Sequence, residues 1–318
     1  MKTSLSGKKI AIPGGTGFFG SHIADKLRTR QIDIDIPQRP KYDFRKKEDC
    51  LCYFKKVRPQ IVINCAAFQG GIGFHSGKQA DLFMDNIAMG CFLMQAAYEV
   101  GVEKFVNIVA GCAYPGYLEE EIMDETDFWN GDVHDSIFSY GFSRKASVIY
   151  GKALHKQHSF NSIHLVLANM YGPRDHYDPE QSKALAALIR KIYEAKKKGE
   201  SEVEIWGTGK PLRDWMYVKD GADGVIRATE VYESIDPLNI ATGRGVSITE
   251  LAQAIKRAVG FKGSFRYNTK KQDGAMKKMF GVKKMKKELN WLPQTTVENG
   301  ILETVKWFDQ NYKTAIKR

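Results

Sequence analysis

The sequence lacks long apolar runs and any cysteine pattern typical of secreted or zinc-binding proteins. No stretch approaches the ~20 apolar residues that a membrane-spanning helix needs, and Met1–Lys9 has no apolar centre of the kind that marks a signal peptide. The cysteines are odd in number and match no zinc-ligand spacing; they are Cys50, Cys52, Cys65, Cys91 and Cys112. We therefore expect a cytoplasmic protein with reduced thiols, no membrane association and no bound metal.

The chain also lacks internal repeats, low-complexity linkers and any recognisable nucleic-acid module, although its formal net charge is +11. Many of the basic residues lie near the C-terminus, at Lys270, Lys271, Lys277, Lys278, Lys283, Lys284, Lys286 and Lys287. That stretch has no interleaved aromatic side chains, so a solvated basic face explains most of these lysines. One or two of them are candidates for a substrate phosphate, and nucleic acid is the least favoured partner.

Short apolar runs alternate with helical patterns in the first half of the chain. The pattern predicts helices over Phe18–Arg28, Asp81–Val100 and Tyr140–His158, and strands over Lys9–Pro13, Ile32–Ile36, Ile61–Cys65, Phe105–Val109 and Ile163–Ala168. Strands separated by helices form parallel β-α-β units, so we expect an α/β fold with a doubly wound, Rossmann-type parallel sheet. Ligands of such sheets gather at the carboxyl ends of the strands.

The pattern changes in the second half. Short strands are expected at Glu202–Trp206 and Trp215–Val218, and a helix over Ser247–Val259 begins with Ser247 as its N-cap. We interpret this part as a smaller substrate lobe interleaved with the last elements of the sheet. The expected division is a Rossmann domain over 1–170 with later segments near 214–245, and a mainly substrate-binding lobe over 171–318.

A glycine loop follows the first expected strand. Gly14, Gly17 and Gly20 are spaced as G-x-x-G-x-x-G between an apolar strand and an amphipathic helix. In that context the glycines let backbone N–H groups approach a pyrophosphate, which then faces the positive N-terminal end of the helix. A purely structural turn is the alternative, but the position favours a dinucleotide site. The other loop residues expected to line it are Thr16, Phe18 and Phe19.

The end of the second strand indicates which dinucleotide is preferred. It reads Ile36-Pro37-Gln38-Arg39, with no acidic residue at the usual ribose position. Arg39 has the guanidinium fork that pairs with a 2′-phosphate, so we expect NADP as the cofactor, with NAD as the alternative.

Tyr140 and Arg144 stand four residues apart in an expected helix, which places both side chains on one face. A cation there lowers the pKa of the phenol, so that the tyrosine can exchange a proton with a carbonyl or hydroxyl while hydride moves. The same spacing occurs by chance on surface helices, and the glycine loop and strand order make it informative here. Lys145 lies one residue further on, about 100° around the helix.

Taken in order along the chain, these motifs resemble the extended short-chain dehydrogenases/reductases, and within them the nucleotide-sugar epimerases/reductases similar to GDP-L-fucose synthase. The resemblance covers nearly the whole chain. It implies that Ala66 and Ala67 contact the cofactor, that Asp43 contacts its adenine, and that two copies of the chain form a homodimer. Its segments beyond the glycine loop are Ala66–Ile72, Cys112–Pro115, Asn169–Pro173, Trp206–Asp214, Asn239–Gly243 and Lys271–Gly274 with Lys278.

Two positions depart from the pattern of this family. Ala110 stands where the family has a serine or threonine whose hydroxyl bonds the reacting oxygen, and Arg144 stands where it has a lysine. The chain matches the residues that epimerisation requires better than those of the redox step. The resemblance matches Cys112 to the cysteine base of the fucose synthases and places Lys183 at the position of their histidine, a pair like the Cys/Lys pair of GDP-mannose 3,5-epimerases. A small buried residue and a solvent-exposed lysine are the alternatives at these two positions.

The resemblance also describes the substrate side. Arg213 and Lys278 are the expected diphosphate contacts, and Asn169 and Trp206 are the expected nucleotide contacts, with GDP favoured by the resemblance alone. We therefore expect an epimerase of a GDP-linked 4-keto hexose or heptose, with the cysteine and the lysine as acid and base. An NADPH-dependent 4-keto reductase or 4-epimerase is the alternative among enzymes. A catalytically impaired dinucleotide-binding protein is the alternative outside them.

Overall fold

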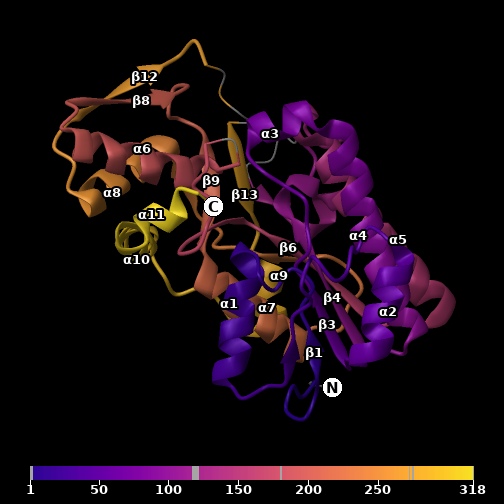
Figure 1. The fold of residues 1–318 in the computed structure, drawn as a ribbon. Helices are drawn as coiled ribbons and strands as arrows, with labels where there is room; N and C mark the ends of the chain where they lie inside the picture. The colour runs from indigo at the N-terminus through magenta and orange to yellow at the C-terminus, as the bar shows by residue number, and fades with distance from the viewer. Residues whose placement is uncertain (1–2, 117–121, 180, 272, 274–275, 318) are drawn as a thin grey trace.

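The computed structural model describes residues 3–116, 122–179, 181–271, 273 and 276–317. A six-stranded, all-parallel sheet forms its centre, in the order β10-β6-β4-β3-β1-β2 (Figure 1). This is the doubly wound, Rossmann-type α/β fold that the sequence predicts. The strands are β1 (Ile10–Ala11), β2 (Ile34–Asp35), β3 (Ile61–Asn64), β4 (Lys104–Ala110), β6 (Ser162–Leu167) and β10 (Leu238–Ile240).

The sheet has its topological switch point between β1 and β3, because β2 pairs with one side of β1 and β3 with the other. A crevice for ligands is expected there, at the carboxyl ends of the two strands. β1 is shorter than the predicted Lys9–Pro13 because Pro13 has no N–H for the ladder and the glycine turn follows at once.

Helices cover both faces of the sheet, and the strands alternate between two apolar clusters. Ile61 and Ile63 of β3 join one cluster and Val62 joins the other, as the period of two requires. The first cluster lies under α1 (Phe18–Thr29) and α7 (Val218–Val231), which pack on each other. The second lies under α2 (Lys47–Val57), α4 (Gln79–Glu99) and α5 (Phe138–His158).

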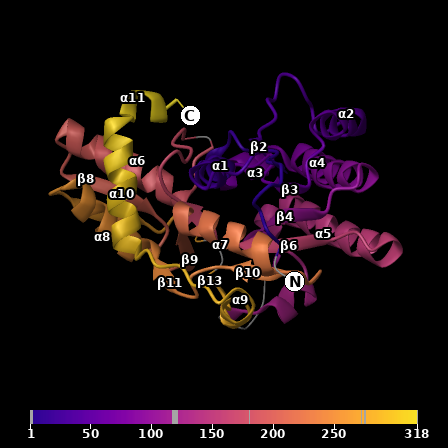
Figure 2. The ribbon, with the colours of Figure 1, turned by 90° about the horizontal axis from the view of Figure 1, so that it is seen from below.

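A smaller lobe holds a mixed sheet in the order β11-β9-β13-β5, with β7 paired to β9, and a separate β12-β8 pair. Figure 2 shows its helices α6, α8 and α10 at the opposite end of the molecule from α2, α4 and α5. Its strands are β5 (Ile122–Met123), β7 (Asn169–Tyr171), β8 (Glu202–Trp206), β9 (Leu212–Tyr217), β11 (Gly245–Ser247), β12 (Ser264–Asn268) and β13 (Lys277–Phe280). Its helices are α6 (Ala184–Lys198), α8 (Ile248–Val259), α10 (Val297–Gln310) and α11 (Tyr312–Ala315).

The chain returns to the large sheet after β9. α7 packs on α1, β10 adds the edge strand beside β6, and α9 (Lys283–Leu289) packs against β10 and α7. The capping box expected at the start of α8 is present, with the Ser247 hydroxyl accepting from the Glu250 N–H at 3.1 Å. The domain boundary near residue 170 stays a prediction.

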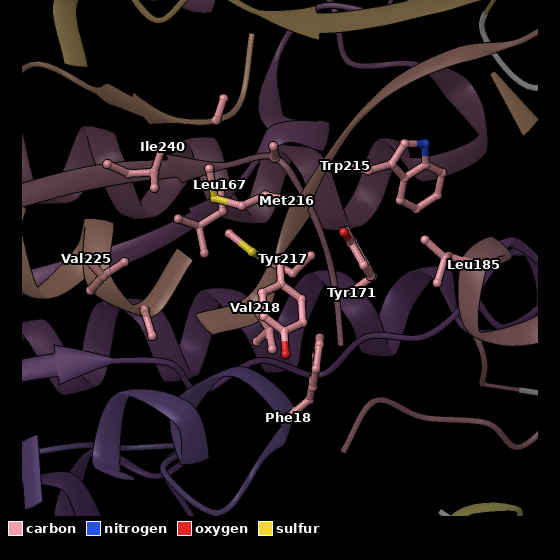
Figure 3. Close-up of a cluster of buried hydrophobic side chains, with 14 of the residues drawn as sticks. Phe18, Leu167, Tyr171, Leu185, Trp215, Met216, Tyr217, Val218, Val225 and Ile240 are labelled. Atoms are coloured by element: carbon pink, nitrogen blue, oxygen red, sulfur yellow. The ribbon is translucent and has the colours of Figure 1, made fainter. Parts of the chain in front are cut away.

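An apolar cluster joins the two lobes beside the glycine loop. Figure 3 shows Phe18 from the start of α1 together with Leu167, Tyr171, Met216 and Tyr217, which come from β6, β7 and β9. All five side chains are buried. The cluster therefore ties the first turn of α1 to the strands that carry the expected substrate residues. No helix in the described part of the chain is long and apolar enough to cross a membrane.

Candidate active site

The glycine loop packs directly against the end of β3. Gly14 has φ +78°, and a Cβ there would lie 2.6 Å from the carbonyl carbon of Cys65 and 2.7 Å from the nitrogen of Ala66. A Cβ on Gly20 would lie 2.4 Å from the carbonyl oxygen of Gly14. Glycine is therefore required at both positions, and the loop meets Ala66 at the switch point of the sheet.

The first turn of α1 offers backbone donors to an anion. Gly17 is the N-cap without a side-chain hydrogen bond, and the first turn contains no acidic residue. Its N–H groups have no partner within the helix, and the positive end of the helix dipole lies here. Thr16 is exposed and Phe19 half-buried, whereas the Phe18 ring lies in the core (Figure 3), which leaves only its backbone for a ligand.

Exposed basic side chains follow the end of β2, and Arg39 and Lys41 are two of them. Arg39 is exposed four residues beyond Asp35, the last residue of β2. The Asp35 carboxylate accepts a 2.6 Å hydrogen bond from the Tyr53 hydroxyl of α2. Asp43 accepts from Nε and Nη2 of Arg45 at 2.8 and 2.9 Å, and these bonds lower the pKa of Asp43 to about 2. Both carboxylates are thus engaged by the protein, and Arg39 is an exposed guanidinium at this strand end, with Lys41 as a further exposed cation.

Cys112 lies in a single 3-10 turn, η1 (Gly111–Ala113), directly after β4. A Cβ on Gly111 would lie 2.4 Å from Cζ of Phe280 on β13, and a Cβ on Gly141 of α5 would lie 2.7 Å from the Cys112 carbonyl oxygen. The Tyr114 hydroxyl donates to Oδ1 of Asn239 at 2.8 Å, which anchors the turn to β10. Three elements distant in sequence, β13, α5 and β10, therefore converge on this turn.

Tyr140 and Arg144 are both deeply buried in α5, with 5% and 2% of their surfaces exposed. Nη2 of Arg144 donates to the carbonyl oxygen of Ile108 in β4, while its Nε and Nη1 have no hydrogen-bonding partner among the described residues. Burial raises the pKa of Tyr140 to about 12, and the Arg144 charge opposes that rise. Lys145 is held elsewhere, because its Nζ donates to the carbonyl oxygen of Gly131 at 3.0 Å.

The charges of three basic side chains act on the pKa of the Cys112 thiol. Burial raises the pKa of Cys112, and the charges of Lys278, Arg144 and Lys183, in that order, oppose the rise. Lys183 is the half-buried N-cap of α6. The thiol is therefore protonated at neutral pH in this state, but every nearby charge favours its thiolate.

Arg213 and Lys278 lie side by side on neighbouring strands, since they are register partners in the parallel β9–β13 pair. Burial lowers the pKa of Lys278 to about 8, with the Arg213 charge also lowering it and Cys112 opposing. Burial lowers the pKa of Arg213 too, against the attraction of Asp273. Two half-buried cations at this spacing suit a polyanion. Gln272 and Gly274 of the same motif lie outside the described residues.

The expected nucleotide contacts occupy two different places. Asn169 is the first residue of β7. Its amide donates to the backbone oxygen of Asp214 at 3.1 Å, and Asp214 follows Arg213 in β9. Trp206 ends β8, is 64% exposed, and lies with its ring centre 5.1 Å from the ammonium of Lys271. The structure therefore places the Asn169 amide on the backbone next to Arg213, and the Trp206 ring beside Lys271.

The sequence patterns did not indicate His75, which lies beside Tyr140 in the candidate site. His75 of α3 (Ile72–Gly77) is 5% exposed, and its ring meets the Tyr140 ring edge-on with centroids 5.4 Å apart. Burial lowers the pKa of His75, and the Lys183 charge lowers it further. A histidine within a glycine-rich loop after a parallel strand was the available signal. The described residues contain no group of three side chains that could hold a metal.

The comparisons with known proteins agree with this geometry. A model described as the NAD dependent epimerase/dehydratase family matches residues 10–241. The chain belongs to this family. The glycine cradle and the unpartnered N–H groups of Arg144 fit a bound dinucleotide, because a pyrophosphate and ribose hydroxyls would occupy such donors.

Similar members of the family extend over the whole chain. A GDP-L-fucose synthase of Sinorhizobium fredii is 32% identical over 96% of this chain and 97% of its own length. A GDP-L-fucose synthetase of Naegleria fowleri, solved with NADP, is 28% identical with a TM-score of 0.90, and the match covers 99% of this chain and 96% of that one. A GDP-6-OMe-4-keto-L-xylo-heptose reductase of Campylobacter jejuni is 25% identical with a TM-score of 0.90, covering 98% and 100%. The protein is an NAD(P)-dependent nucleotide-sugar epimerase/reductase of the extended short-chain dehydrogenase/reductase type.

Proposed function

We propose that this enzyme epimerises a GDP-linked 4-keto hexose or heptose at a carbon next to the carbonyl, with Cys112 and Lys183 as the acid–base pair. The names of its similar relatives, a GDP-L-fucose synthase and a GDP-4-keto-heptose reductase, support the substrate class. The observation that carries the proposal is the position of Cys112 in the turn directly after β4, where the charges of Lys278, Arg144 and Lys183 all lower the pKa of its thiol.

The chemistry needs one proton removed and one returned. Solvent first takes the proton of the Cys112 thiol. The resulting thiolate takes the proton from the carbon next to the carbonyl, and the electron pair of that bond moves to give an enolate. The Lys183 ammonium donates a proton to the opposite face of the same carbon, which inverts it. The Tyr140 hydroxyl, whose pKa of about 12 keeps it protonated, donates a hydrogen bond to the enolate oxygen. Solvent then reprotonates the amine, and the thiol, which now carries the proton from carbon, is back in its starting state.

Arg213 and Lys278 hold the diphosphate in this proposal, and Asn169 and Trp206 contact the nucleotide. Among the charges that lower the pKa of Cys112, that of Lys278 has the largest effect. A diphosphate bound at Lys278 therefore places the attached sugar ring next to the thiol. Once the diphosphate neutralises Lys278, Lys183 and Arg144 remain to favour the thiolate.

We propose NADP(H) as the cofactor. Gly14, Gly17 and Gly20 with the first turn of α1 hold the pyrophosphate, Arg39 pairs with the 2′-phosphate, and Arg144 donates to the nicotinamide ribose. Thr16, Phe19, Asp43, Ala66 and Ala67 line the remainder of this site. When bound, NADP(H) supplies reversible hydride transfer.

A 4-keto reductase is the second candidate, because Tyr140 and a cation share one face of α5. Solvent-deuterium exchange on GDP-4-keto sugars separates the candidates. Deuterium incorporation without NADPH supports epimerisation. NADPH oxidation without deuterium incorporation supports reduction, and neither signal across a panel of GDP-4-keto sugars supports a protein that binds a dinucleotide without turnover.

We also propose that α4 and α5 mediate a homodimer. Phe83 and Met84 of α4 and Ile149 of α5 are exposed apolar side chains, with Met84 61% and Ile149 57% exposed. Burying these side chains against a second copy removes apolar surface from water. A monomeric mass by light scattering would contradict the proposal.

A further inference from the structure

His75 is a buried titratable group for which the proposed mechanism has no use. Only 5% of its surface is exposed, and its Nδ1 is buried without a hydrogen-bonding partner among the described residues. Buried polar atoms in proteins are nearly always paired, so an unpaired one calls for a ligand atom or water. The residues around His75 indicate which of these two partners fits.

The surroundings of His75 are those of the proposed substrate site. Its ring meets that of Tyr140 edge-on, with an interplanar angle of 76°. A Cβ on Gly71, which caps α3, would lie 2.5 Å from the carbonyl oxygen of Ser182, so the loop that carries His75 touches the segment that carries Lys183. His75 thus contacts Tyr140, and its loop contacts the segment that carries Lys183; both of these side chains act on the keto sugar in the proposed mechanism.

The ring has a defined hydrogen-bonding state. The Gly70 backbone accepts a hydrogen bond from the ring, and the unpartnered Nδ1 leaves Nε2 as the donor. Burial lowers the pKa of His75, and the Lys183 charge lowers it further, so the imidazole is neutral at pH 7. With the proton on Nε2, Nδ1 carries a lone pair and is an acceptor.

We infer that Nδ1 of His75 accepts a hydrogen bond from a hydroxyl group of the sugar, which makes His75 a substrate-specificity residue. A hydroxyl is the fitting partner because Nδ1 needs a donor, and in the proposed mechanism Lys183 donates to the reacting carbon and Tyr140 to the enolate oxygen. The inference rests on the proposed GDP-sugar function. It concerns the sugar and leaves GDP itself untouched.

Two amide variants separate this role from a structural one. In His75→Gln the side-chain amide reaches the place of Nε2 and keeps a donor for Gly70, but the acceptor at Nδ1 is lost. In His75→Asn the amide oxygen takes the place of Nδ1, and the bond to Gly70 is lost. His75→Phe removes both nitrogens and serves as a second variant without the acceptor.

The probes are GDP and GDP-mannose, titrated by calorimetry into the full-length protein loaded with NADPH. We expect His75→Gln and His75→Phe to weaken GDP-mannose about tenfold and to leave GDP within about twofold, because one hydrogen bond to the sugar is lost. We expect His75→Asn to bind GDP-mannose more tightly than His75→Gln. His164→Gln is the matched control, because His164 is a fully buried histidine of β6 with an unpartnered Nε2.

Three results overturn the inference while leaving the proposed function intact: GDP-mannose affinity unchanged in His75→Gln and His75→Phe, equal weakening of GDP and GDP-mannose, or His75→Asn weaker than His75→Gln. A wild-type protein that binds neither GDP nor GDP-mannose overturns the proposed function, and the inference with it. Melting temperatures of all variants confirm that each is folded under the titration conditions.

Discussion

The proposed cofactor side and the proposed substrate side of this enzyme are built in opposite ways. The cofactor side is made mainly of backbone from two short loops, Gly14–Gly20 and the turn after β3, pressed together by atoms that leave no room for a Cβ. The substrate side is made of side chains that arrive singly from α3, η1, α5, α6, β9 and β13. The first depends on the absence of side chains, and the second depends on their charge.

This difference decides how each side responds to change. A backbone cradle cannot adapt to added atoms, so one methyl group should abolish it. A cluster of side chains loses one contribution at a time, and its charges make it respond to pH. The following variants test that contrast, from the largest expected effect to the smallest.

Gly14→Ala should abolish NADPH binding. The new Cβ meets the Cys65 carbonyl carbon at 2.6 Å, and φ +78° is strained for alanine. Fluorescence titration with NADPH should show affinity lower by about a hundredfold or more, because the cradle cannot close around the pyrophosphate.

Gly101→Ala is the matched control for this variant. Gly101 has the same φ of +78°, but a Cβ at this position would have nothing within 4 Å, so the variant isolates strain from crowding. It should lower stability by about 1–2 kcal/mol and leave NADPH affinity unchanged. Equal losses of NADPH binding in both variants would contradict the crowding argument.

Ala110→Ser should speed hydride transfer. Ala110 ends β4 and precedes the Cys112 turn, where a hydroxyl would add a donor to the reacting oxygen. One such donor contributes about a hundredfold in rate. Single-turnover absorbance of bound NADPH with a GDP-4-keto sugar measures the change, and Ala110→Gly controls for local disturbance. An unchanged rate in the serine variant would mean that the oxygen reacts elsewhere.

Arg39→Ala should reduce NADP affinity about tenfold or more and leave NAD affinity unchanged, because the guanidinium pairs with the phosphate that only NADP carries. Calorimetric titration of both cofactors into wild type and variant provides the measurement. NAD bound as tightly as NADP by the wild type would remove Arg39 from cofactor selection.

Lys278 should make GDP-mannose binding pH-dependent. Its pKa of about 8 in the free protein means that it loses its charge above that pH, and a bound diphosphate favours the charged form. Affinity should therefore be constant below pH 7 and fall about tenfold between about pH 7 and 9. Lys278→Met should bind more weakly with no such fall; a wild-type profile without the fall would place the diphosphate away from Lys278.

The sequence predicted what depends on local pattern. The alternation of apolar residues placed the central strands and helices, and the spacing of Gly14, Gly17 and Gly20 located the cradle. Tyr140 and Arg144 share a face of α5 because helical periodicity is regular. Strand ends were less accurate, since Pro13 and the glycine turn shorten β1 in a way that apolar content does not reveal.

Residue patterns alone could not predict contacts that depend on how distant segments pack together. The lysine-rich segment near the C-terminus resembled a solvated face, yet β13 places Lys278 beside Arg213 and close to Cys112. For His75 the local signal was only a histidine in a glycine-rich loop, because its partners lie 65 and 108 residues further along the chain, at Tyr140 and Lys183. For Cys112, Lys183 and Lys278, only the family resemblance supplied the expectation.

The most direct test of the central claim is deuterium incorporation into a GDP-4-keto sugar in heavy water, followed by mass spectrometry. Wild type and Cys91→Ser should exchange at similar rates, because Cys91 is another thiol under the influence of Arg144 but lies on α4, an element with no part in the proposed mechanism. Cys112→Ser should keep NADPH binding and exchange about a hundredfold or more slowly, as expected for loss of a general base. Exchange by Cys112→Ser within a few-fold of wild type would contradict the account.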